Sequence, residues 1–117
     1  MKKSFLLLFI PVLMVSFIQP LQLFKTSLKV TVRNDLGNTE SGAQVSLYKS
    51  KEDYQKSQNA VATKITDEKG NVLFTDLEAI VYYMSAEKGD KNNFDAGEKT
   101  DALLPEKINK VTVIISE

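Results

Sequence analysis

Apolar and polar residues alternate with a period of two from Leu28 to the end of the chain. Leu28, Val30 and Val32 each lie between polar neighbours, which is typical of a strand with one buried face. The pattern recurs at 43–47, 61–65 and 111–115. Further short strands are expected at 72–77, at 80–86, which is rich in β-forming residues, and at 100–104, with turn residues such as Gly, Asn and Asp between the segments. We therefore predict an all-β, transthyretin-like or immunoglobulin-like sandwich of about seven strands.

Two places between these segments carry a different local signal. Ser50 is followed three residues later by Asp53, a spacing that caps the start of a helical turn, so a short helix is expected over Ser50–Lys56. Residues 66–71 form an acidic cluster that ends in Gly70 and Asn71. Glycine suits the left-handed position that closes a four-residue hairpin loop, and a β-hairpin is therefore expected here.

The first 24 residues differ in composition from the rest of the chain. Lys2 and Lys3 precede an apolar run from Phe5 to Ile18, and no acidic residue occurs before Asp35. This order is typical of a secretory signal peptide, and the run is shorter than the ~20 residues of a membrane span. We expect residues 1–24 to be a signal peptide or an N-terminal membrane anchor, and residues 25–117 to form one domain.

The composition narrows the possible chemistry. The sequence has neither cysteine nor histidine, so thiol catalysis, disulfides and the usual zinc ligand sets are excluded, together with the commonest general base. The formal net charge is zero, and basic and acidic residues are interspersed. Nucleic acid is therefore not an expected partner, and no cofactor is expected.

Four stretches resemble a known family: residues 28–37, 41–48 and 66–77, and the pair Tyr82-Tyr83. They are similar to carboxypeptidase-regulatory-like domains, whose transthyretin-like (prealbumin-like) sandwich is shared by the B-type repeats of bacterial collagen adhesins. Each matched position also has a structural explanation. Gly42 and Ala43 would pack closely at a strand entry, Asp67 and Gly70 would make a turn, and Phe74 and Leu77 would fill the core.

The resemblance implies two activities that the residues here do not support. Transthyretin-related hydrolases use histidines, which this sequence lacks. Adhesin repeats often carry a lysine–asparagine crosslink promoted by a buried glutamate. The family's lysine position falls here on Arg33 and its glutamate position on Ala86; Glu87 would point to the opposite face, and Asn109 has no matching lysine. No crosslink is expected.

Aromatic residues are the candidate binding groups. Tyr82 is expected to face inward and bond through its hydroxyl at the rim of the core. Tyr83 would then point outward, near Tyr48 and Phe94, as in surfaces that bind sugars or proteins. Scattered surface aromatics are also common without any function.

Two further features of the sequence concern a possible cation site and an exposed strand edge. The loop 89–97 contains oxygen ligands for calcium in Asp90, Asn92 and Asp95, but its spacing does not fit an EF-hand, and a solvated turn explains it as well. Ile114, on the outer face of the last strand, points to an edge that another strand could cover.

These observations predict a non-enzymatic module that is exported and is periplasmic, cell-surface or extracellular. Its role would be structural or would consist of binding a protein or a glycan. The alternative is an accessory subunit tethered to the membrane through residues 1–24. A small hydrolase is the third possibility, although the sequence offers no nucleophile–base pair for it.

Overall fold

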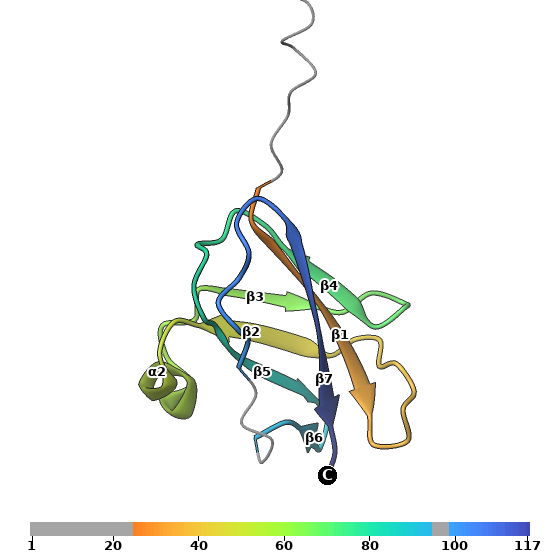
Figure 1. Cartoon of the computed structure of the whole chain (residues 1–117). Helices are drawn as coiled ribbons and strands as arrows, with labels where there is room; N and C mark the ends of the chain where they lie inside the picture. Colours follow the sequence, from red (N-terminus) through yellow and green to blue (C-terminus); the bar gives the residue numbers. More distant parts are fainter. Residues whose placement is uncertain (1–24, 95–98) are drawn as a thin grey trace, which may run out of the picture.

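The computed structural model describes residues 25–94 and 99–117, which form two β-sheets packed face to face with one short helix at the side (Figure 1). The three-stranded sheet has the order β4-β1-β7, with bounds Asn71–Phe74, Ser27–Asn34 and Ile108–Ile115. The four-stranded sheet has the order β3-β2-β5-β6, with bounds Ala62–Ile65, Gln44–Tyr48, Tyr83–Lys88 and Lys91–Asn92. The helix is α2, Lys51–Lys56. The predicted all-β sandwich is confirmed.

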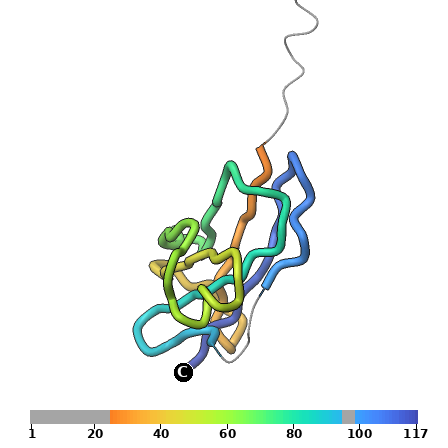
Figure 2. Tube along the Cα trace, turned by 90° about the vertical axis from the view of Figure 1, so that its left-hand side faces the viewer, coloured from red at the N-terminus to blue at the C-terminus, as the bar shows by residue number. Residues whose placement is uncertain are grey.

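Strand β1 is the centre of the three-stranded sheet. It pairs antiparallel with β4 and parallel with β7, and the pairing with β7 runs from Ser27–Ile108 to Asn34–Ile115. In both views the orange segment of β1 and the blue segment of β7 run close to each other (Figures 1 and 2). The first and last strands of the described domain are therefore joined by backbone hydrogen bonds.

The core lies between the two sheets and is built by alternate residues of their strands, as the period of two predicts. Phe74 and Tyr82 are its largest side chains, each 1% exposed, and the Tyr82 hydroxyl accepts a hydrogen bond from the Glu78 N–H at 3.0 Å. The other apolar residues of the core are Leu28, Val30, Val32, Ala43, Val45, Leu47, Val72, Met84, Ala86, Leu103, Val113 and Ile115, with Leu77 packed against it.

Helix α2 forms where the capping signal predicts it. The Ser50 hydroxyl accepts a hydrogen bond from the Asp53 N–H at 3.1 Å, which satisfies one of the free donors at the helix start. The helix ends at Ser57, which adopts a left-handed conformation (φ 51°).

The turn at residues 66–71 forms, but the hairpin expected there does not. Asp67 and Gly70 close the turn through a backbone hydrogen bond of 2.9 Å. However, β3 before the turn pairs with β2, and β4 after it pairs with β1 in the other sheet. Gly70 has the expected positive φ of 79°, and a Cβ there would lie 2.8 Å from the Cβ of Thr39. Because glycine has no Cβ, the chain can cross between the sheets here while lying close to Thr39 and the backbone of Glu40.

The third strand forms, but its apolar residues do not face the core. Val61 is 40% and Ile65 57% exposed, whereas Ala62 packs against the core. Lys64 is on the same face as Ala62, and its ammonium group lies 5.8 Å from the centre of the Phe74 ring and donates to the Leu73 carbonyl at 2.9 Å. The strand is therefore confirmed, but the inner face expected from Val61, Thr63 and Ile65 is wrong: Ala62 and the stem of Lys64 lie on the side of the core instead.

Three other expectations need correction. The predicted strand 100–104 is absent: this segment is joined to residues 80–83 by single hydrogen bonds, such as that from the Thr100 N–H to the Tyr82 carbonyl, and by the bridge between Tyr83 and Lys99. The segment expected as one loop from residue 89 contains β6, joined to β5 by a tight turn. Nothing lies within 4 Å of a Cβ built on Gly42, whose φ is 76°; the turn conformation, not close packing, requires glycine there.

The signal peptide or anchor predicted at residues 1–24 lies outside the described residues. Among the residues that are described, no helix has the length and apolar character needed to cross a membrane.

Candidate binding surface

The predicted aromatic residues lie on the outer face of the four-stranded sheet, where α2 packs. Tyr48 of β2 and Tyr83 of β5 are direct cross-strand partners. Tyr54 of α2 contacts both: its ring centre lies 5.9 Å from that of Tyr48, edge-on, and 6.2 Å from that of Tyr83. As a result Tyr48 is only 5% exposed and Tyr83 is half-buried. Tyr83 therefore points outward beside Tyr48, as expected, but the helix covers the pair, so the expected exposure of Tyr83 is wrong.

Phe94 is different, because half of its surface is exposed. Together with α2 it forms a depression of about 350 Å³ whose walls are Lys51, Tyr54, Gln55, Ser57 and Phe94. We call this depression the aromatic pocket. Two aromatic side chains provide apolar surface, and the amide of Gln55 and the ammonium group of Lys51 provide hydrogen-bond donors. This mixture is typical of small binding sites.

Tyr54 is the residue that sequence reasoning missed in this pocket. The segment around it, Lys51–Lys56, was recognised as a helix only by its cap, and six residues are too short to show an apolar period. A tyrosine among the polar and charged residues of this segment was the available signal. Its role depends on its contacts with Tyr48 and Tyr83, and the sequence does not show that the helix packs on these two residues.

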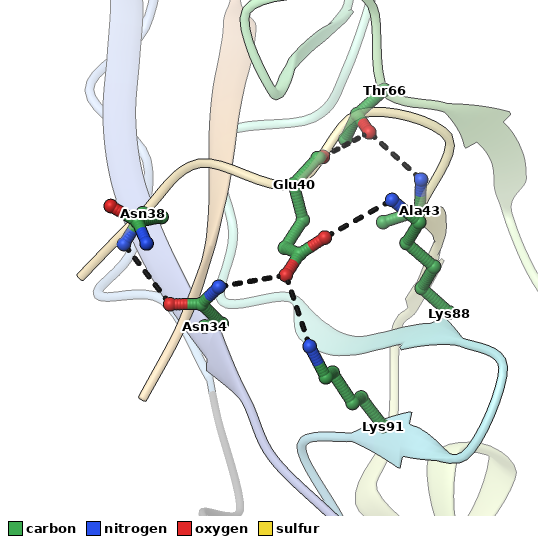
Figure 3. A network of polar contacts seen from close by, with 7 residues as sticks. All are labelled: Asn34, Asn38, Glu40, Ala43, Thr66, Lys88 and Lys91. Carbon is green, nitrogen blue, oxygen red and sulfur yellow. Dashed lines mark hydrogen bonds and ion pairs between the residues drawn. The ribbon is translucent and has the colours of Figure 1, made fainter. Parts of the chain in front are cut away.

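A second polar cluster surrounds Glu40, in the connection between β1 and β2 (Figure 3). Its carboxylate accepts hydrogen bonds from Asn34 at 2.9 Å, Lys88 at 3.1 Å and Lys91 at 3.3 Å. Asn34 belongs to the three-stranded sheet and both lysines to the four-stranded one. The hydrogen bond from Asn34, followed by those from the two lysines, lowers the pKa of Glu40 to about 2. We call these four residues the Glu40 cluster.

The backbone of Glu40 is held as firmly as its side chain. Its carbonyl accepts a hydrogen bond of 2.7 Å from the Thr66 hydroxyl, which in turn accepts one of 2.9 Å from the Ala43 N–H (Figure 3). This explains why Ala43 and Thr66 are buried at the strand entry. The Glu40 cluster therefore fastens the two sheets together at one end of the sandwich.

Shifted pKa values in the described part of the chain occur at Glu40 and at two other groups. An ion pair with Glu78 raises the pKa of Lys49. The Asn71 N–H, followed by that of Lys69, lowers the pKa of Asp67. In each case the neighbours favour the ionised form, whereas a general acid or base is shifted toward neutral pH. These groups are therefore suited to holding structure and not to proton transfer.

The structure describes two of the three calcium candidates, Asp90 and Asn92. Asn92 lies in β6, where its side-chain oxygen accepts from the Phe94 N–H at 3.0 Å and its backbone bridges to Ser116. Asp90 is exposed in the turn before β6, and Asp95 lies outside the described residues. Within the described ranges, no group of three or more acidic side chains is placed to hold a metal ion.

The positions expected for the family crosslink have other partners. Arg33 donates to the Gly37 carbonyl at 2.7 Å, Ala86 lies in the core, and the Asn109 amide bonds to the backbone of Leu104 and Ser27. Lysine, asparagine and glutamate do meet in the Glu40 cluster. There, however, the lowered pKa keeps Glu40 ionised, and the crosslinking chemistry needs a neutral acid beside an uncharged amine.

Comparison with known proteins identifies the fold. No protein-family model matches this chain, and no curated protein matches its sequence. Among solved structures, the major pilin subunit BcpA of Bacillus cereus matches with a TM-score of 0.53 and 16% identity, covering 80% of this chain and 30% of the pilin. A variant of the same pilin matches with a TM-score of 0.52 and 18% identity, over the same shares. The chain shares a β-sandwich fold with part of this pilin subunit and spans less than a third of its length.

A third solved structure, chlorocatechol 1,2-dioxygenase from Pseudomonas putida, matches at 14% identity over 80% of this chain and 61% of the enzyme. Its TM-score of 0.45 is too low to show a common fold.

Proposed function

We propose that this chain is a non-catalytic, exported module of the cell surface that has a structural role and binds a protein or glycan through the aromatic pocket. The observation that carries the proposal is the sandwich shared with a segment of a major pilin subunit, over 80% of the chain. The basic and apolar start of the sequence supports export. The resemblance to carboxypeptidase-regulatory-like domains and adhesin repeats supports the same class of role.

The chemistry of the described residues also favours this role over catalysis. The chain has no histidine or cysteine, and the shifted carboxylates Glu40 and Asp67 are held ionised by their neighbours. Such groups stabilise the connections between strands. The aromatic pocket, in contrast, exposes an apolar ring with donors beside it, as in sites that bind without reacting.

Export is tested by expressing the full chain with a C-terminal epitope in a bacterial host and labelling intact cells with a membrane-impermeant amine reagent. We expect the chain to be labelled while a cytoplasmic marker is not. A mature N-terminus near residue 25 would indicate a removed signal peptide, and an intact one the tethered accessory subunit. A chain that is protected in intact cells and labelled only after lysis would refute the proposed location.

Binding through the aromatic pocket is tested with Phe94→Ala, since Phe94 is exposed and its loss leaves the core intact. Tyr48→Ala would be uninformative because Tyr48 is buried beneath α2. The control is Leu36→Ala, which removes a side chain that is 82% exposed in the β1–β2 connection. On a glycan array and in capture from envelope extracts, Phe94→Ala should lose the ligands that the wild type and Leu36→Ala retain. Equal retention by all three would rule the pocket out.

A further inference from the structure

A second surface lies on the outer face of the three-stranded sheet. Leu73 of β4, Lys29 of β1 and Lys110 of β7 form one row across the sheet, because Lys29 is in register with both of the others. Ile108 begins β7 at the end of the same face. Leu73 is 41% and Ile108 50% exposed, although the outer side chains of a sandwich are usually polar.

These side chains line a groove of about 520 Å³, which we call the basic groove. Lys69 and Asp67, from the turn between the sheets, complete its rim beside β4. The groove therefore has apolar residues from both edge strands, and lysines from β1, from β7 and from the turn before β4.

The charge of the basic groove is balanced only in part from within, because three lysines of the lining face one carboxylate. In the part of the chain that the structure describes, the side chains of Lys29, Lys69 and Lys110 form no hydrogen bond and no ion pair within 4.0 Å. The one carboxylate of the lining, Asp67, already accepts two backbone N–H groups, at 2.9 and 3.0 Å. In addition to these backbone hydrogen bonds, the charges of Lys69 and Lys29 help to lower the pKa of Asp67, so three ammonium groups surround an apolar floor and a single carboxylate, which leaves two positive charges in excess.

We propose that the basic groove docks an acidic peptide segment of a partner protein. An apolar side chain of the peptide rests on Leu73 and Ile108, and carboxylates on either side of it face Lys29, Lys69 and Lys110. Charge complementarity requires an anionic partner. The exposed apolar floor favours a peptide over a polysaccharide or nucleic acid, since a uniform polyanion would leave Leu73 and Ile108 without an apolar contact. This surface is independent of the aromatic pocket.

The probe for this proposal is a short fluorescein-labelled peptide of alternating Asp and Leu, titrated with the domain and followed by fluorescence anisotropy. Two further peptides separate the contributions: one with Lys in place of Asp, and one with Ser in place of Leu. We expect only the Asp–Leu peptide to bind well, and we expect its affinity to fall as salt is raised.

The variants are Lys29→Glu and Lys110→Glu, with Lys56→Glu as the matched control. Lys56 lies in the last turn of α2, outside both the groove and the aromatic pocket, and its substitution changes the net charge by the same amount. Each groove variant should weaken binding by roughly tenfold or more, whereas Lys56→Glu should leave it within about twofold. Circular dichroism establishes that each variant is folded, and Lys110→Glu, on an exposed side chain, guards against a folding defect in Lys29→Glu.

Several results would overturn the proposal. The proposal is wrong if the Asp–Leu peptide does not bind, if Lys56→Glu weakens its binding as much as the groove variants do, or if neither groove substitution affects binding. If the Ser-containing peptide and dextran sulfate bind as well as the Asp–Leu peptide, the groove is a general anion site and not a peptide site. If sedimentation shows self-association of the free domain that Lys110→Glu abolishes, its occupant is a second copy of this chain, and the proposed partner protein is wrong.

Discussion

The two sheets of this sandwich differ in whether their outer faces are covered. The outer face of the four-stranded sheet places Tyr48 beside Tyr83, and α2 covers the pair with Tyr54. The outer face of the three-stranded sheet places Leu73 beside Lys29 and Lys110, and leaves Leu73 and Ile108 exposed. Both faces carry apolar side chains, yet only one of them is covered by the described chain.

The difference lies in the connecting segments and not in the strands. The connection after β2 contains a capped helix, which turns back over the sheet that the chain has just left. The connections on either side of β4 cross directly between the sheets, through the tight turn at Gly70 and past Leu77, which packs against the core. The outer residues of a strand are thus buried or exposed according to the loop that follows it, which the alternation within the strand does not specify.

The largest expected difference in stability is between substitutions on the inner and the outer face of β4. Phe74 fills the core and Leu73 lies on the basic groove, although the two are adjacent in β4. Phe74→Ala should lower the free energy of unfolding by about 3–5 kcal/mol, because it leaves a cavity. Leu73→Ala, the control, should change it by less than about 0.5 kcal/mol. Urea denaturation measures both, and similar losses would mean that the groove face is structural.

Removing the side chain of α2 that covers the four-stranded sheet should have an intermediate effect on the free energy of unfolding. Tyr54→Ala takes away the ring that packs on Tyr48 and Tyr83, and should cost about 1–2 kcal/mol of unfolding free energy. Gln55→Ala is the control, since it changes the next residue of α2 and lines the same pocket. Urea denaturation of both variants, with tyrosine fluorescence as the readout, tests this. If Tyr54→Ala is as stable as Gln55→Ala, α2 does not contribute to the sheet it covers.

The helix cap should contribute about 1 kcal/mol. Ser50→Ala leaves the Asp53 N–H without its side-chain acceptor and loosens α2 over the tyrosine pair. Ser41→Ala, in an exposed turn before β2, serves as the control for loss of a serine hydroxyl. Thermal denaturation should show a lower Tm for Ser50→Ala alone; a matching decrease in the control would contradict the capping role.

The smallest change should come from the Glu40 cluster, which joins the sheets and belongs to neither outer face. Its contribution is complete above the ordinary pKa of 4.5, where Glu40 is ionised in both the folded and the unfolded chain, and it is lost as the pH falls toward about 2. The lysine side chains are 43% and 35% exposed, so solvent screens the effect.

The measurement is the free energy of unfolding of wild type and Glu40→Gln between pH 7 and pH 2. The difference between them should shrink below pH 4.5. Glu52→Gln removes an exposed carboxylate of α2 and should follow the wild-type pH dependence. If the difference in unfolding free energy between wild type and Glu40→Gln stays constant with pH, the charge of Glu40 contributes no stability.

The strands were predictable from sequence because one buried face imposes a period of two, which is visible at Leu28–Val32 and at Val111–Ile115. The capped helix and the positive φ of Gly70 were predictable for the same kind of local reason. The order of strands was not, since the turn at residues 66–71 has the same chemistry whether it joins paired strands or crosses between sheets. Likewise, Ile65 is exposed and Lys64 lies over the Phe74 ring because β3 is at the edge of its sheet.

The site was less accessible to prediction than the fold. Phe94 was identified by its type, and Tyr54 was missed because its partners come from two distant strands. Glu40 gave no signal at all: Lys88 and Lys91, which hold its carboxylate, are 48 and 51 residues away in the chain. Contacts of this kind exist only after the sheets have formed, so no local pattern can encode them.

The parallel pairing of β1 with β7 has a mechanical consequence. The chain enters this pair at Ser27 and leaves it at Ile115, at opposite ends. A stretching force between these points runs along the strands, so the hydrogen bonds between them are strained simultaneously in shear and do not peel open one after another. Rupture then requires the whole interface to fail at once, an arrangement that suits a domain carrying tension.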